Sequence, residues 1–139
     1  MKPKKTVIIT GSSRGIGYEL VSLFSEAGYA VLALSRNTNP LTALKLKNVT
    51  VIPFDLENTE DYNKVESFVK KEWERVNILI NNAGILINQP FSQTTIEDFK
   101  KVYNTNVFGL AELIRKVLPF MPRDGHVVSI SSLSLIHIS

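Results

Sequence analysis

The chain contains no cysteine, no long hydrophobic run and no marked excess of charge of one sign. Without cysteine, disulfide bonds and thiolate metal sites are excluded, and we assign no metal site. The apolar run at residues 7–9 is too short for a signal peptide or a membrane span. Sixteen lysines and arginines stand against thirteen aspartates and glutamates and are scattered along the chain, which argues against nucleic acid. We therefore expect a cytoplasmic protein that binds neither membranes nor nucleic acid.

Short apolar runs alternate with segments of helical periodicity over 139 residues, of which 44% are hydrophobic. The runs predicted to be strands are residues 6–10, 29–34, 49–54, 76–80 and 126–131. This alternation is typical of βαβ units and predicts an α/β fold with a parallel sheet. The length suits a single domain.

Helical periodicity predicts two helices between these strands. The first spans residues 16–27 and ends before Gly28, which suits a left-handed C-cap. Its predicted buried face comprises Ile16, Leu20, Leu23, Phe24 and Ala27. The second starts with Asn58 as its N-cap and carries the stripe Val65, Phe68, Val69 and Trp73. Residues 37–48, which include Pro40, are predicted to form a loop with at most a short helix.

The longest predicted helix starts at Thr95, whose hydroxyl can cap the backbone while Asp98 reaches back three residues. It ends before Pro119. Its apolar stripe comprises Ile96, Phe99, Val102, Tyr103, Val107, Leu110, Ile114 and Val117. Asn106 falls within this stripe, where asparagine has poor helix propensity and a buried amide needs a hydrogen-bond partner. A structural and a catalytic role would each explain it.

Residues 10–17 place three glycines between an apolar strand and an amphipathic helix. Gly11 permits the turn out of the strand, Gly15 lets the backbone approach a pyrophosphate, and Gly17 lets the helix pack closely against the sheet. The helix N-terminus supplies free N–H groups and the positive end of a dipole. A glycine turn without a ligand is the alternative, but the flanking strand and helix favour a dinucleotide site.

This glycine spacing resembles that of the short-chain dehydrogenases/reductases, and four further segments resemble the same family in the same order. They are Asp55-Leu56, Asn81-Asn82-Ala83-Gly84, Asn106-Val107-Phe108-Gly109 and the strand at residues 125–132. Taken alone, each has an ordinary alternative: a strand end, a turn, a structural amide or serines at a sheet edge. Their order favours the resemblance, which covers about residues 4–132.

The resemblance implies a Rossmann-like, doubly wound parallel sheet with strand order 3-2-1-4-5 over residues 1–132, incomplete at the C-terminus. The cofactor-binding residues that it implies are Gly11, Ser12, Ser13, Arg14, Gly15, Ile16, Gly17, Ser35, Arg36, Asp55, Leu56, Asn82, Ala83 and Gly84. It also implies two catalytic residues. In the family, the asparagine that matches Asn106 holds a water in a proton relay and stabilises a helix irregularity. The serine that matches Ser132 holds the substrate oxygen.

Cofactor preference depends on the residues that meet the adenosine ribose after the second strand. An acidic residue accepts from the 2′-hydroxyl and repels a 2′-phosphate, whereas arginine attracts the phosphate. Ser35 stands where NAD-preferring relatives carry aspartate, Arg36 follows it, and Arg14 can add a second positive charge. Two solvent-exposed arginines without a ligand are the alternative. The pattern predicts a preference for NADP(H).

The family's reaction transfers a hydride between the nicotinamide and a carbonyl or alcohol carbon, with a tyrosine as proton donor. A lysine four residues after that tyrosine lowers its pKa. None of the four tyrosines has a lysine there: Tyr18 is followed by Ser22, Tyr29 by Ala33, Tyr62 by Glu66 and Tyr103 by Val107. We therefore expect an inactive fragment, with weak cofactor binding, of an oxidoreductase with a small carbonyl or alcohol substrate.

The alternative is a dinucleotide-binding module without hydride chemistry, acting as a sensor or a partner subunit. A tyrosine followed four residues later by lysine in the intact gene would separate the two hypotheses. In relatives the long helix contributes to a dimer interface, so the resemblance implies a parent protein that is a homodimer or homotetramer.

Residues 133–139, Leu-Ser-Leu-Ile-His-Ile-Ser, look foreign to the family. They correspond to the translation of CTG TCT CTT ATA CAC ATC T, a transposon end used in DNA library preparation. We interpret them as an adaptor-derived tail on a truncated reading frame and exclude them from the fold. A natural, divergent C-terminus is the alternative. Sequencing the locus from unfragmented DNA would distinguish the two.

Overall fold

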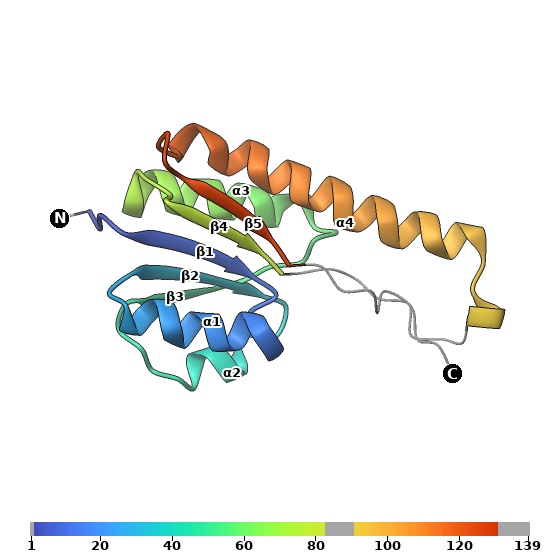
Figure 1. Ribbon diagram of the computed structural model, residues 1–139, viewed down its shortest axis with the longest axis horizontal. Helices are drawn as coiled ribbons and strands as arrows, with labels where there is room; N and C mark the ends of the chain where they lie inside the picture. Colours follow the sequence, from blue (N-terminus) through green and yellow to red (C-terminus); the bar gives the residue numbers. More distant parts are fainter. Residues whose placement is uncertain (1, 83–90, 131–139) are drawn as a thin grey trace.

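The computed structural model describes residues 2–82 and 91–130. In this part of the chain one parallel sheet is formed by β1 (Thr6–Thr10), β2 (Ala30–Ser35), β3 (Val49–Pro53), β4 (Ile78–Asn81) and β5 (His126–Ser129). The strand order is β3-β2-β1-β4-β5, as predicted. The chain moves outward from β1 in one direction and then from β4 in the other, so a topological switch point lies between β1 and β4 (Figure 1).

Helices cover both faces of this sheet. On one face lie α1 (Gly15–Glu26) and the short α2 (Asn39–Thr42); on the other lie α3 (Thr59–Phe68) and α4 (Ile96–Val117) (Figure 1). A π-helical turn, η1 (Val69–Trp73), extends α3, and 3₁₀ turns occur at η2 (Phe91–Gln93) and η3 (Leu118–Phe120). The doubly wound α/β class is therefore confirmed.

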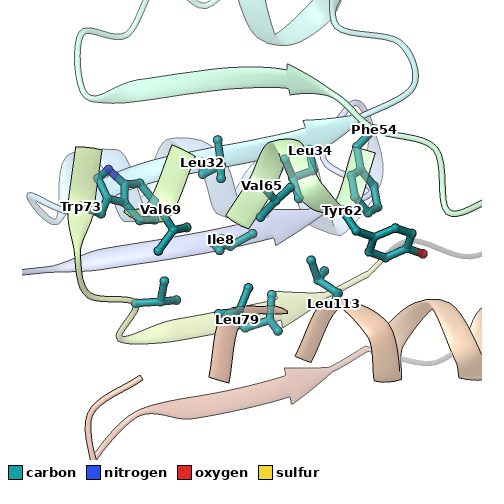
Figure 2. Close-up of a cluster of buried hydrophobic side chains, with 12 residues drawn as sticks. Ile8, Leu32, Leu34, Phe54, Tyr62, Val65, Val69, Trp73, Leu79 and Leu113 are labelled. Atoms are coloured by element: carbon teal, nitrogen blue, oxygen red, sulfur yellow. The ribbon is translucent and has the colours of Figure 1, made fainter. Parts of the chain in front are cut away.

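The alternation of side chains along β1 divides the core into two clusters. Val7 and Ile9 point towards α1, and Ile8 points towards α3; all three are fully buried. The α1 cluster comprises Val7, Ile9, Val21, Val31, Ala33, Leu41 and Ile80. The opposite cluster, shown in Figure 2, comprises Ile8, Leu32, Leu34, Phe54, Tyr62, Val65, Val69, Trp73, Val76, Leu79, Leu113 and Val117. Burial on both faces explains why these strands read as continuous apolar runs.

The local signals at the helix ends are confirmed. Gly28, after α1, has φ +89°, a conformation that glycine adopts without strain. The Asn58 side chain caps α3 by accepting from the Glu60 amide. Thr95 and Asp98 form a reciprocal capping box at the start of α4. The predicted loop between β2 and β3 contains only the short α2, with a proline in its first turn.

The predicted face of α1 is partly wrong. Ile16 and Leu23 are each 59% exposed, whereas Gly17 and Val21 are buried. The helix contacts the sheet through Gly17, because a glycine allows the helix to approach more closely than the larger Ile16 side chain would. In this orientation Leu23 faces away from the sheet.

The predicted face of α4 is also partly wrong. Its buried residues are Val102, Gly109, Leu113 and Val117. The N-terminal half of α4 projects past the end of the sheet (Figure 1). Apolar side chains in that half are therefore exposed, including Ile96, Phe99 and Tyr103, and Val107 just beyond it is exposed as well.

We predict that Asn58→Ala lowers the free energy of unfolding by about 1 kcal/mol, because the Glu60 amide loses its side-chain acceptor. Asn58→Ser should retain most of this stability. Urea unfolding followed by circular dichroism measures the difference. Asn63→Ala, within the same helix, is the matched control and should not destabilise the chain; an equal loss in both variants would contradict a specific capping role.

Candidate functional site

The carboxyl ends of all five strands lie at the same edge of the sheet. The register pairs Thr10 with Leu34, Ser35 with Pro53, and Asn81 with Ser129. Adjacent strands lie about 4.8 Å apart, so the segment after β3 lies roughly 10 Å from the segment after β1. Segments far apart in the sequence therefore converge beside the switch point.

The glycine loop between β1 and α1 is attached to the end of β2. Gly11 and Gly15 adopt φ values of 60° and 62°, which favour glycine. Ser12 is fully buried, and its amide and hydroxyl both donate to the Leu34 carbonyl, at 3.3 and 3.1 Å. Arg14, the N-cap of α1, makes no side-chain capping bond. The first amides of α1 are thus not capped by Arg14.

Gly17 lies where α1 contacts the loop and the end of β4. A Cβ at this position would lie 2.5 Å from the Gly11 carbonyl oxygen and 2.7 Å from Asn82 Nδ2. The predicted role of Gly17 in close helix packing therefore has a direct geometric basis. The same amide of Asn82 donates to the Gly11 oxygen at 3.1 Å, so three of the predicted cofactor-binding residues meet at one point.

Thr10 is a site residue that the motif analysis did not single out. Its hydroxyl donates to Asn81 Oδ1 at 3.2 Å and accepts from the Asn82 amide at 2.9 Å. Thr10 and Asn81 are both buried. A polar residue at the end of an otherwise apolar strand was the available signal, because a buried hydroxyl needs partners. The glycine loop and the Asn81-Asn82 segment are thereby joined.

The predicted phosphate-recognition residues follow β2. Ser35 is 5% exposed, and its hydroxyl donates to the Asn37 carbonyl at 3.1 Å. Arg36 and Arg14 are exposed. Neither guanidinium forms an ion pair with another residue in the described ranges. Both positive charges are therefore available to an anion at this edge of the sheet.

The segment after β3 is fixed by the first turns of α3. The Asp55 amide donates to Asp61 Oδ2 at 2.9 Å, and the Tyr62 hydroxyl donates to the Leu56 carbonyl at 2.8 Å. The sequence analysis missed Asp61 and Tyr62. Asp61 lies three residues after the N-cap Asn58, a spacing that predicts a capping box. Its carboxylate instead reaches six residues back to Asp55.

Burial raises the pKa of Tyr62 to about 12, and the nearby carboxylates of Glu112, Asp55 and Asp61 add to this increase. The phenol is only 3% exposed. The neutral form, which can donate to Leu56, is thus the stable form up to high pH.

The remaining predicted residues are less completely placed. Asn106 lies on α4 and is half-buried. Ala83, Gly84 and Ser132 lie outside the described residues. An open cleft of about 400 Å³ lies between the segment after β3 and α4; its lining includes the predicted cofactor-binding residue Leu56, together with Tyr62 and Phe108, but not Asn106.

Within residues 2–82 and 91–130, no group of three or more histidine, aspartate or glutamate side chains could hold a metal ion. No helix in the same ranges has the length and hydropathy needed to cross a membrane.

Substitutions at two glycines should separate steric from conformational constraints. At Gly17 the cost is steric, so Gly17→Ala should destabilise by roughly 1–3 kcal/mol and Gly17→Ser by more. At Gly15 a Cβ meets no atom within 4 Å, and only φ is unfavourable. Gly15→Asn should therefore be milder than Gly15→Ala, because asparagine tolerates the left-handed region. Urea unfolding measures the loss of stability in each of the four variants. A smaller loss for Gly17→Ser than for Gly17→Ala would contradict the steric constraint, and a smaller loss for Gly15→Ala than for Gly15→Asn would contradict the conformational one.

The raised pKa of Tyr62 predicts a loss of stability at high pH. The folded chain keeps the phenolic proton more tightly than the unfolded chain, whose tyrosine pKa is about 10. This contribution is complete below pH 10 and is lost as the pH rises towards about 12. The Tm of Tyr62→Phe should therefore fall less between these pH values than that of the unaltered chain. Tyr103→Phe, at an exposed position, is the control and should change nothing.

Comparison with known proteins agrees with this geometry. The family described as short chain dehydrogenase matches residues 5–135. Ketoacyl reductase HetN of Nostoc sp. is 33% identical over 138 residues, covering 94% of this chain and 48% of the relative. NADP-dependent 3-hydroxy acid dehydrogenase YdfG of Escherichia coli is 31% identical over 132 residues, covering 91% of this chain and 53% of the relative.

A solved structure gives the same result for the fold. A short-chain dehydrogenase from Streptomyces avermitilis, 32% identical, superposes with a TM-score of 0.79 over 92% of this chain and 49% of that chain. The chain spans about half the length of the curated relatives that it matches. With its glycine loop, its strand order and a family match over nearly all its residues, the chain belongs to the short-chain dehydrogenase/reductase family.

Proposed function

We propose that this chain forms the NADP(H)-binding part of an oxidoreductase. The bound cofactor would supply hydride transfer to or from a carbonyl or alcohol carbon of a small molecule. The observation that carries this proposal is the arrangement at the switch point. There, a glycine loop with two positive φ values precedes α1, whose N-cap residue Arg14 carries a positive charge and has no side-chain acceptor for the first helix amides.

The residues present suit a dinucleotide. Amides at the N-terminus of α1 can bind the pyrophosphate, because they carry the positive end of the helix dipole. A Cβ added at Gly15 would have no atom within 4 Å. This open space leaves room for a phosphate to approach the backbone. Asp55 and Leu56 would contact the adenine, and Asn82, Ala83 and Gly84 would line the cofactor further along.

The preference for NADP(H) over NAD(H) rests on Arg14 and Arg36. Both are exposed and lack an ion-pair partner within the described residues. Ser35 leaves no carboxylate at the position where one would repel a 2′-phosphate. The relative YdfG, which its name describes as NADP-dependent, supports the same preference.

For the whole protein, we propose that two residues of this chain assist a tyrosine proton donor, which none of the four tyrosines here matches. Asn106 would hold a water in the proton relay, and Ser132 would donate to the substrate oxygen. We infer a cytoplasmic homodimer or homotetramer in which residues 1–132 contribute the cofactor domain. The names of the relatives, a reductase and a dehydrogenase, favour this over a binding module without chemistry.

Titration of NADPH and NADH into the purified chain, followed by nicotinamide fluorescence, tests the proposal. NADPH should bind more tightly than NADH, and Arg36→Asp should weaken NADPH binding by about tenfold or more, the size expected for a lost charge-assisted contact. Arg14→Ala should weaken it less.

Arg123→Asp provides the matched control, because Arg123 is also exposed but precedes β5 at the opposite edge of the sheet. It should leave both affinities unchanged. Absence of binding of either coenzyme, or an equal effect of the Arg36 and Arg123 substitutions, would contradict the proposal.

A further inference from the structure

Two consecutive residues of α3 bind the backbone of two consecutive residues after β3. Asp61 Oδ2 accepts from the Asp55 amide at 2.9 Å. The next side chain, Tyr62, donates its hydroxyl to the Leu56 carbonyl at 2.8 Å. Each side chain thus fixes a different backbone group of the Asp55-Leu56 segment, one through an acceptor and the other through a donor.

The Asp61 carboxylate is placed where its charge is costly. The residue is 7% exposed, and its other oxygen lies 3.4 Å from the exposed ammonium group of Lys64. Burying a carboxylate is unfavourable unless hydrogen bonds compensate it. The helix does not need this carboxylate as a cap, because Asn58 already caps α3. Its hydrogen-bonded partner outside the helix is the Asp55 amide.

Tyr62 fixes the same segment from the core side. Its ring packs edge-on against Phe54 with centroids 5.0 Å apart, and its oxygen lies at the margin of the cluster (Figure 2). Behind it, α4 approaches through Gly109. A Cβ there would lie 2.9 Å from Leu56 Cδ2 and 3.0 Å from the Tyr62 oxygen. The Leu56 side chain therefore contacts α4 closely at Gly109, which limits its movement at that point of the helix.

Asp55 is fixed in orientation as well as in position. One oxygen of its own carboxylate accepts from the Glu57 amide at 2.9 Å, a local turn that limits rotation of the side chain. The preceding residue, Phe54, donates its amide to the Ser35 carbonyl at 3.0 Å. The Asp55 carboxylate therefore has a defined place relative to the end of β2, where Arg36 follows.

We propose that Asp61 and Tyr62 are positioning residues that fix Asp55 and Leu56 against the purine base of the dinucleotide, and thereby set the discrimination between adenine and other purines. This inference rests on the proposed function. A carboxylate accepts a hydrogen bond from the exocyclic amino group of adenine. Hypoxanthine presents a carbonyl oxygen at the same position, which a carboxylate repels.

The test compares the binding of NADPH with that of its deamino analogue, in which hypoxanthine replaces adenine. The readout is the ratio of the two dissociation constants. A general loss of structure weakens both ligands and leaves this ratio unchanged, whereas displacement of Asp55 changes it. The unaltered chain should favour NADPH by about tenfold, the size expected for one hydrogen bond to a charged group.

Asp61→Ala should bring the ratio close to one. Asp61→Asn should restore much of it, because an amide oxygen can still accept from the Asp55 amide. Tyr62→Phe retains the ring and removes only the hydroxyl, so it should reduce the ratio partially. Tyr62→Phe keeps the test valid if Asp61→Ala does not fold.

Asp98→Ala is the matched control. Asp98 also accepts from a backbone amide near a helix start, at 2.9 Å from the Thr95 nitrogen, but on α4 rather than beside Asp55. It should lower stability without changing the ratio. An unchanged ratio in folded Asp61→Ala or, failing that, in Tyr62→Phe would overturn the inference, as would a ratio of one in the unaltered chain. If the unaltered chain binds neither ligand, the proposed function fails and the inference fails with it.

Discussion

The close approach of α1 to the carboxyl edge of the sheet is the constraint on which the site depends. Gly17 has no side chain, so the helix can lie against the Gly11 carbonyl and the Asn82 amide. With this contact in place, Asn82 can donate to Gly11, and Thr10 can join the ends of β1 and β4 through its hydroxyl. The helix N-terminus consequently lies at the topological switch point, where neighbouring connections diverge and leave space for a ligand.

Hydrogen bonds within this edge divide the residues into two groups. Ser12, Thr10 and Ser35 direct their hydroxyls at protein carbonyl or amide groups and stabilise the loops. Arg14 and Arg36, by contrast, extend into solvent. The short hydrogen-bonded side chains therefore hold the backbone of the site in place, and the two exposed arginines form a rim whose side chains can adjust to a ligand. Recognition of a phosphate by such a rim needs little rearrangement of the backbone.

The sequence was sufficient for features with local causes. Alternating apolar runs predicted the strands, and Asn58, Thr95 and Gly28 marked helix ends through chemistry confined to one turn. The buried faces of α1 and α4 were predicted less well, since periodicity does not reveal how far a helix extends past its sheet. Exposed Ile96 and Tyr103 are examples.

Asp61 and Tyr62 were missed for a different reason. Their partners, Asp55 and Leu56, lie six residues earlier, beyond the three- and four-residue spacings that helices use. The path of the turn between β3 and α3 decides which backbone amide the carboxylate meets, and no periodic pattern in the sequence reports that path.

The edge strand β5 affects how the protein behaves at high concentration. Val127 and Val128 of β5 point to opposite faces and are 42% and 43% exposed, unlike the fully buried valines of β1 and β2. Among the described residues, β5 pairs only with β4. A strand that is apolar on both sides and unpaired along one edge is a template for self-association. The tendency to self-associate in concentrated solution is thus located at the opposite side of the sheet from β3.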